Sequence, residues 1–277
     1  GSLIYKRQIA YYGRLSWNYL DRYYCQFNFR ADSYDSAYLD LHHNWGYFPS
    51  VSVGWTFNNE DFMKGVTGKG FSYGKLRLSY GVNGSISNLG DYMYASNLRT
   101  GQYDIANSTA NMAYWLDGQL YKGTYPNSTL ANPKLRWERS KQFDAGLDLR
   151  FLDGRLSATM DYYHKMTDGL LVQSVAPLVT GTSTVYQNLG KVLNSGLELE
   201  LEWRDHIGDF GYGVKGNIAI LHNKVTKYRG KGTRISGSGL LSASSALTYF
   251  EEDYPLWYIR GYKMTGVNQQ TGEAIYE

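Results

Sequence analysis

Three glutamates at alternate positions, Glu198, Glu200 and Glu202, have the clearest spacing for chemistry in this chain. Alternate side chains of a strand share a face, so neighbouring members of the set would lie about 7 Å apart. Some glycosidases separate their two catalytic carboxylates by about that distance. The sequence indicates no partner site for them, and the simpler interpretation is that all three line one water-exposed wall.

Two further motifs resemble cofactor and metal sites but lack the context that such sites need. The run Gly211-Tyr212-Gly213-Val214-Lys215-Gly216 has the glycine spacing of a dinucleotide-binding turn, but it lies within an alternating segment, and no helix follows to receive a pyrophosphate. His42 and His43 are adjacent in a polar stretch without a third ligand at useful spacing. We therefore predict no cofactor, no metal site and no enzymatic activity.

The elements that carry these residues are predicted to be β-strands, because apolar and polar residues alternate along them. In Phe143 to Phe151 the odd positions are apolar, and the even positions hold two aspartates, a glycine and an arginine. Successive strand side chains point to opposite faces, so such a segment has one apolar and one polar face. The pattern recurs in these segments: Arg14 to Leu20, Tyr24 to Asp32, Val51 to Phe57, Lys75 to Val82, Phe143 to Phe151, Leu156 to Tyr162, Leu197 to Arg204 and Tyr212 to Ile220.

The composition agrees with an all-β, antiparallel fold. Aromatic residues make up 16% of the 277 residues, while 31 residues are glycine and only 5 are proline. The net charge of +3 is too balanced for a nucleic-acid-binding protein, and no basic stripe is present. The single cysteine, Cys25, excludes an intrachain disulfide. No run of about 18 apolar residues predicts a membrane-spanning helix, but membrane-spanning strands are compatible with the mean hydropathy of −0.45.

The connections between the predicted strands alternate between short and long. Three have hairpin length: Leu20 to Arg22, Leu152 to Gly154 and Asp205 to Asp209. Four are long and polar: 33–48, 84–138, 163–189 and 223–260. Short turns on one side and long loops on the other are typical of outer-membrane β-barrels. The connection 58–72 lies on the short-turn side, and its segment Glu60 to Lys64 predicts one helical turn.

Several short stretches are more specific than the alternation. The most distinctive reads Asn-Leu-Gly-Lys-Val-Leu-Asn-Ser-Gly-Leu-Glu-Leu over 188–199. The others are 44–55, 60–64, 75–81, 131–138, 146–148, 161–163, 167–171, 261–263 and 271–273. In this order, and over nearly the whole chain, they resemble the barrel region of the SusC/RagA-type TonB-dependent outer-membrane transporters.

The resemblance implies a plugged, up-and-down antiparallel barrel of about 22 strands in the outer membrane of a Gram-negative bacterium. It also implies energisation through TonB, import of oligosaccharides or peptides, and a SusD-like surface lipoprotein as partner. Residues 1–277 contain nothing that resembles the plug or a TonB box, and too few strands to close such a barrel. We expect 1–277 to be part of the barrel domain, with the plug domain and the remaining strands absent from it.

The polar face of such a barrel lines a water-filled lumen, and its apolar face contacts outer-membrane lipid. The charged residues predicted to face the lumen, where they wet the channel or contact the plug, are Lys75, Arg77, Asp144, Asp148, Arg150, Glu198, Glu200 and Lys215. Substrate contact is expected in 84–125, which mixes flat rings with adaptable polar groups. The candidate substrate-binding residues are Tyr92, Tyr94, Tyr103, Tyr114, Trp115 and Tyr121. Packing within the loop or against the lipoprotein is the alternative role for these rings.

Two other classes of protein show a similar alternation. One is a soluble or surface-exposed β-sheet module that binds carbohydrate, and the other is an enzyme such as a glycosidase. The classes differ in what covers the apolar face, which is lipid for a barrel and a second sheet for a sandwich. The structure of the sheet therefore discriminates between them.

Overall fold

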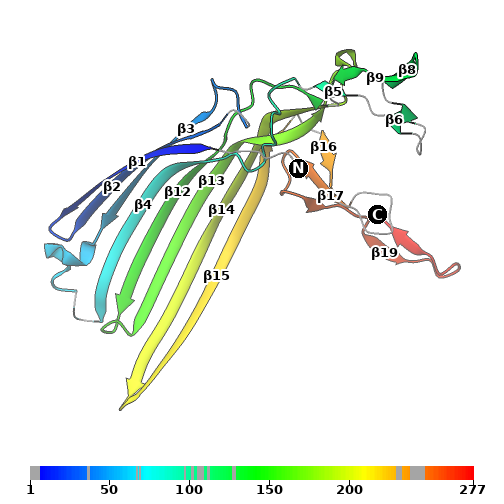
Figure 1. Ribbon diagram of the computed structural model, residues 1–277. Helices are drawn as coiled ribbons and strands as arrows, with labels where there is room; N and C mark the ends of the chain where they lie inside the picture. The colour runs from blue at the N-terminus through cyan, green and yellow to red at the C-terminus, as the bar shows by residue number, and fades with distance from the viewer. Residues whose placement is uncertain are drawn as a thin grey trace.

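The computed structural model describes residues 7–35, 38–66, 68, 70–96, 98–100, 103–104, 109–110, 113–126, 129–228, 233–237 and 247–277. Its main feature is a nine-stranded sheet that forms a curved, open wall (Figure 1). Its long strands are β1 (Gln8–Tyr19), β2 (Tyr23–Tyr34), β3 (Trp45–Trp55), β4 (Phe71–Ser85), β12 (Glu138–Phe151), β13 (Leu156–Val175), β14 (Thr184–Ile207) and β15 (Phe210–Lys227). These strands are antiparallel neighbours in that order, and the short β11 (Thr129–Leu130) runs parallel to the start of β14.

Every segment predicted to be a strand contains one, and several strands are longer than the alternation indicates. The predicted segments overran two strands, because Leu20 lies in the turn after β1, and Thr56 and Phe57 follow the end of β3. The main error concerns 163–189, which we predicted to be a loop. Instead, β13 runs to Val175 and β14 begins at Thr184. The pairing of these two strands shifts register twice, between Asp168 and Leu170 and between Leu170 and Leu171. Each irregularity moves the following side chains to the other face, so the sequence no longer alternates in simple fashion there.

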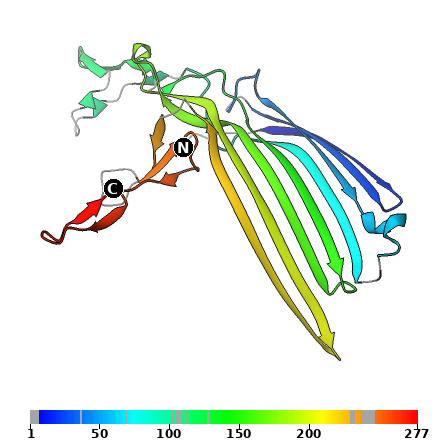
Figure 2. The ribbon, with the colours of Figure 1, turned by 180° about the vertical axis from the view of Figure 1, so that it is seen from behind.

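The ends of the wall differ as the connection lengths predict. At one end, β1 and β2 meet in a tight turn in which Leu20 (φ 53°) and Asp21 (φ 51°) are both left-handed, the backbone of a type I′ hairpin. The longer connection on the same side contains two 3₁₀ turns, η1 (Phe57–Asn59) and η2 (Asp61–Met63), which confirms the predicted helical turn. Figure 2 shows these turns along the lower rim, opposite the long loops.

The long-loop end carries only short elements. They are β5 (Leu98–Thr100), β6 (Tyr103–Asp104), β7 (Thr109–Ala110), β8 (Ala113–Leu116), β9 (Gln119–Lys122), β10 (Thr124–Pro126), η3 (Leu178–Thr180), β16 (Arg234–Ser236), β17 (Thr248–Glu251), β18 (Tyr258–Ile259), β19 (Met264–Val267) and β20 (Ala274–Tyr276). Apart from the turn η3, they pair into small sheets of two or three strands beside the wall (Figure 1).

The two faces of the wall differ in chemistry. One face, called here the apolar face, carries side chains such as Leu15, Leu197 and Ile220, which are 71%, 49% and 64% exposed. The other, called the polar face, carries Arg77, Asp148 and the other charged residues at alternate positions. No second layer of described residues covers the apolar face, so the β-sandwich required by the binding-module alternative is not formed. Among the described residues, no helix is long and apolar enough to span a membrane.

The buried apolar residues lie at the long-loop end rather than between layers. One cluster joins Phe48 of β3 to loop residues that include Leu39, Leu135 and Trp137. Phe48 is two residues from Ser50 and therefore lies on the polar face by alternation. A second cluster is made of Val172, Val192, Val225, Tyr228 and Phe250. The loops thus fold onto the polar face at this end and leave the apolar face bare.

Candidate functional site

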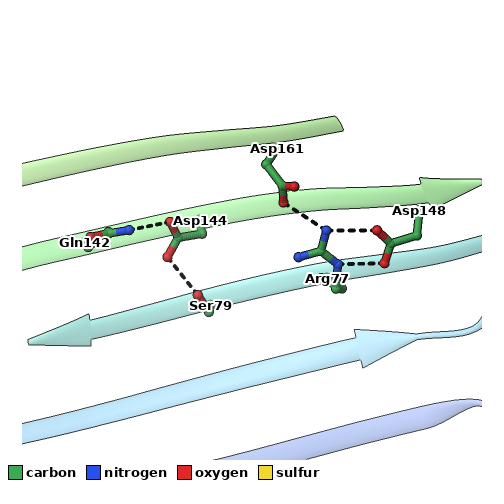
Figure 3. A network of polar contacts seen from close by, with 6 residues as sticks. All are labelled: Arg77, Ser79, Gln142, Asp144, Asp148 and Asp161. Carbon is green, nitrogen blue, oxygen red and sulfur yellow. Dashed lines mark hydrogen bonds and ion pairs between the residues drawn. The ribbon is translucent and has the colours of Figure 1, made fainter. Parts of the chain in front are cut away.

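The centre of the polar face is a charge network on three adjacent strands (Figure 3). The guanidinium of Arg77 on β4 donates two hydrogen bonds to Asp148 on β12, of 2.7 and 2.9 Å, and one of 2.9 Å to Asp161 on β13. A forked guanidinium held by two carboxylates forms charge-assisted bonds with defined geometry. Nearby, Asp144 accepts hydrogen bonds from Ser79 at 2.9 Å and from Gln142 at 2.7 Å. The charges of this region are therefore largely paired with one another.

Gly146 makes the three-strand contact possible. It pairs with Arg77 on one side and with Asp161 on the other, so the arginine must cross β12 at this position. A Cβ added to Gly146 would lie 2.4 Å from Asp161 Oδ1 and 2.6 Å from Arg77 Cζ. Any larger residue would therefore displace the ion pair. The sequence showed a polar face here, but not the dependence of the network on this glycine.

Lys75 makes a similar crossing in the opposite direction. Its ammonium lies 4.6 Å from the ring centroid of Tyr24 on β2, and its Cε would be 3.2 Å from a Cβ at Gly54 on the intervening strand β3. An ammonium over an aromatic face is attracted by the ring quadrupole. Beside these residues, the polar face is hollowed to a volume of about 420 Å³, lined in part by Gln26, Ser52, Lys75, Arg77 and Asp144.

The remaining predicted lumen residues also lie on the polar face. The Lys215 ammonium on β15 is 2.7 Å from a carboxylate oxygen of Glu200 on β14. Arg150 lies over the ring of Tyr73, with Cζ 5.1 Å from the centroid. Glu198 pairs in the ladder with Asp161 and so shares its face. The structure brings all the residues predicted to face the lumen onto one face of one sheet.

Among the described residues, the loop aromatics predicted to bind substrate do not form one cluster. The rings of Tyr92 and Tyr94 are 6.5 Å apart, and Tyr94 also packs against the cluster of Leu39 and Trp137. The Tyr121 hydroxyl donates a 3.3 Å hydrogen bond to Gln119 Oε1 within the β8–β9 hairpin. Three of the residues predicted to bind substrate, Tyr103, Tyr114 and Trp115, have side chains that lie outside the described part of the structure.

At the short-turn end, Glu60 is a hydrogen-bond acceptor that the sequence analysis missed. Its carboxylate accepts bonds from the Tyr23 hydroxyl at 2.5 Å, the Trp55 indole at 3.0 Å and the Arg22 guanidinium at 3.1 Å. The hydrogen bonds from Tyr23 and Trp55 favour the charged form and lower the pKa of Glu60. The longer turn is thereby tied to the rim of the sheet. Only the position of the glutamate just before a helical turn gave a signal for this role.

Aromatic rings gather at both ends of the apolar face. At the short-turn end, Trp55 lies 5.7 Å from Phe57 and 6.4 Å from Phe62 between ring centroids. At the long-loop end, Tyr11 stacks on Trp45 at 6.1 Å. Rings at both borders of an apolar band are the pattern of barrels that span a membrane.

Among the described residues, the polar face does not gather the side chains of a metal site. The described residues contain no group of three or more histidine, cysteine, aspartate or glutamate side chains that could hold a metal ion. Two of the three alternate glutamates of β14 form ion pairs: Glu200 with Lys215, and Glu202 with Arg204. These contacts fit a hydrated wall whose charges neutralise one another.

An unclosed antiparallel sheet with a bare apolar band, aromatic borders and a charged opposite face is a sector of a membrane β-barrel wall. The family comparison agrees with this class. The chain belongs to the TonB-dependent receptor family, because the family model described as "TonB dependent receptor-like, beta-barrel" matches residues 3–274. This family consists of transporters rather than enzymes.

The chain is also similar to individual TonB-dependent receptors. The chain is 33% identical over 224 residues to the TonB-dependent receptor SusC of Bacteroides thetaiotaomicron, covering 80% of this chain and 21% of SusC. It is 28% identical over 262 residues to the TonB-dependent receptor P39 of Formosa agariphila, covering 93% of this chain and 22% of that protein. The chain therefore spans about a fifth of the length of these curated relatives.

Solved structures show the same fold. The structure of the RagAB peptide transporter superposes with a TM-score of 0.77 at 22% identity, over 98% of this chain and 27% of the matched chain. The "open-open" state of the RagAB peptide importer gives a TM-score of 0.79, also at 22% identity, over the same shares of the two chains. This chain therefore shares the fold of about a quarter of each matched chain.

Proposed function

We propose that residues 1–277 form part of the barrel domain of a TonB-dependent importer in the outer membrane of a Gram-negative bacterium. The observation that carries this proposal is the back-to-back arrangement of a bare apolar face and a charged face on the same strands. An apolar face without a protein cover suits lipid, and a charged face suits a water-filled channel. The role is one of transport, without catalysis and without a resident cofactor or metal.

The dimensions of the apolar face support membrane insertion. Trp45 and Trp55 begin and end strand β3, ten residues apart. At about 3.3 Å per residue this is about 33 Å along the strand, or about 25 Å across a membrane for a strand tilted by about 40°. The apolar band of outer-membrane barrels is about 25 Å tall. The aromatic borders are therefore spaced as an outer-membrane barrel needs.

The charged residues of the polar face are proposed to line the lumen. The ion pairs of Arg77 with Asp148 and of Lys215 with Glu200 keep the charges fixed while their free edges hydrogen-bond to water or to a plug domain. Hydrophilic nutrients could then pass without crossing an apolar surface. The proposed cargo is an oligosaccharide or a peptide, and the proposed contact region includes Tyr92, Tyr94 and Tyr121.

The proposed partners are a SusD-like surface lipoprotein and the TonB complex. The similarity to SusC and the fold shared with RagAB support this assignment. The solved RagAB structures are described as those of a peptide transporter, which makes peptides one of the two cargo classes to test. The TonB complex would act through parts of the barrel protein other than the described sheet.

Uptake by cells tests the proposal. A strain that makes the full-length protein and a deletion strain would receive a labelled peptide mixture and a labelled oligosaccharide mixture, with and without a protonophore. We expect uptake of one cargo class to require the protein and to stop when the protonophore removes the energy source of TonB. Equal uptake in the two strains, or recovery of the protein in the soluble fraction, would contradict the proposed function.

A further inference from the structure

A second hollow, distinct from the one beside Arg77, lies at the long-loop end of the wall. Its volume is about 650 Å³. One side is the end of β13, with Leu170, Val172 and Ser174, and the other side contains Phe250 and Trp257 from the β16–β18 region. None of the residues that line this hollow is ionisable. It is therefore a mostly apolar recess at the end where the long loops gather.

The recess lies on the polar side of the sheet. Val192 and Val225 pair directly and lie two residues from the paired Asn194 and Asn223, on the face that carries the lumen charges. These valines are packed with Val172 and Phe250 in one buried cluster. The recess borders that cluster, so it opens beside the proposed channel and not toward lipid. A solute entering the channel from the loop end would pass it.

Ser174 supplies an unpaired polar group in the recess. Ser174 is only 4% exposed, and its hydroxyl has no hydrogen-bond partner among the described residues. Ser174 lines the recess together with its neighbours Gln173 and Val175, and unlike these two exposed residues it is buried. A buried hydroxyl without a partner is costly, so such groups usually serve a ligand or a bound water.

Trp257 forms an aromatic wall of the same recess. Its ring lies 5.8 Å from that of Phe250, and it stands over Gly237, where an added Cβ would be 2.8 Å from the indole. Its backbone is left-handed, with φ of 55°, a conformation that a bulky residue keeps only where its surroundings impose it. The residue remains 45% exposed. The indole is thus held in place while part of it stays free for contact.

The polar groups around the recess are too few for a sugar. Four polar side chains line the recess. The Asn88 amide N–H groups are directed to Glu138, at 3.0 and 3.1 Å, and Thr184 shares a 3.2 Å hydrogen bond with Thr129, which leaves Gln173 and Ser174 for a ligand. A sugar carries hydroxyls on most of its carbons, and in an apolar recess most of them would lose their hydrogen bonds to water. An apolar amino-acid side chain leaves no such groups unpaired.

We propose that this recess is a subsite for an apolar side chain of a peptide cargo, with the Ser174 hydroxyl bonding to the adjacent peptide amide. The proposal rests on the proposed import function and selects peptides over oligosaccharides as the cargo. The aliphatic walls and the Trp257 indole would bury the side chain, while the backbone of the peptide stays in the wet channel. No covalent step is involved.

Binding of two matched peptides to the full-length protein in detergent tests the proposal. The probes are a fluorescein-labelled nonapeptide of glycine, serine and asparagine with one central leucine, and the same peptide with a central serine. Fluorescence anisotropy should show that the leucine peptide binds about tenfold tighter, the ratio expected for burial of a leucine side chain. Ser174→Phe, which fills the recess, should reduce the ratio to about one. Ser174→Ala should weaken both peptides and keep the ratio.

Val179→Phe is the matched control, because Val179 in η3 is 94% exposed and does not line the recess. It should keep the wild-type ratio. Heat-modifiable gel migration shows whether the Ser174→Phe variant folds into a barrel. If that variant does not fold, Leu256→Trp replaces it, because this substitution fills the recess from the opposite wall. An equal affinity for the two peptides, a leucine preference that survives filling, or loss of oligosaccharide binding alone on filling would each overturn the proposal. Cargo uptake that still requires the protein would show that the import function stands even then.

Discussion

Replacing Ile218 by arginine should destabilise the protein strongly, whereas the same change at its neighbour should not. Ile218 lies near the middle of β15 on the apolar face, pairs with Leu199 and is 59% exposed in the structure. Asn217 points to the other face and pairs with Glu200. An arginine on the lipid side near the bilayer midplane costs about 2–4 kcal/mol, and about 3 kcal/mol would lower the folding equilibrium constant by roughly two decades. On the wet side, Asn217→Arg should cost less than about 0.5 kcal/mol.

The measurement is equilibrium unfolding by guanidinium of the full-length protein inserted in lipid vesicles, with tryptophan fluorescence as the probe. Both variants introduce the same side chain into adjacent positions of one strand, so differences in strand propensity cancel. The informative quantity is the difference between the two variants in the free energy of unfolding. A difference below about 0.5 kcal/mol would refute the assignment of the bare face to lipid, because a face covered by water or protein would not separate the two positions in this way.

Two further predictions concern the polar face and the short-turn rim. Gly146→Ala should push Arg77 off its carboxylates and lower the free energy of unfolding by about 1 kcal/mol, a value kept small by the partial exposure of the ion pair. Gly216→Ala should be nearly neutral, because an added Cβ there meets nothing within 4 Å. Vesicle unfolding of both variants checks this, and equal effects would contradict the crossing role of Gly146. Because its hydrogen bonds lower the pKa of Glu60, their stabilising effect is full above the ordinary pKa of 4.5 and is lost as the pH falls through the lower folded value. Glu60→Gln should therefore speed proteolysis of the connection between β3 and β4 at pH 7 but match the wild type once the pH lies below the folded pKa of Glu60, and a gap that does not narrow as the pH falls would contradict this explanation.

The alternation of residue types predicted which side chains share a face, and it did so correctly wherever the ladder is regular. It failed over 163–189 because the register shifts near Leu170 move side chains from one face to the other. Polar residues therefore occur at both odd and even positions in this segment, a pattern that predicts a loop. Irregularities of this kind have no strong local sequence signal, because they depend on the partner strand.

The sites depend on contacts that alternation does not determine. The pairing of Arg77 with Asp161 requires the register of three strands at once, and the sequence alone fixes none of these registers. The recess at Ser174 requires that the β16–β18 segment, more than 50 positions later, fold back onto β13. Aromatic composition led us to expect ligand contact in 84–125, whereas our proposal also involves Trp257, which stands out only through its left-handed backbone and the recess that it lines.

Taken together, the two glycine crossings explain how a wide wall keeps its charges fixed. Lys75 and Arg77 are alternate residues of β4, and they reach in opposite directions, over Gly54 to Tyr24 on β2 and over Gly146 to Asp161 on β13. Each cation therefore links strands that are not hydrogen-bonded neighbours. Such side-chain links resist sliding and folding of the sheet about the intervening strand, which backbone hydrogen bonds between adjacent strands do not prevent. A charged face that lacks an apolar core gains stiffness from these links.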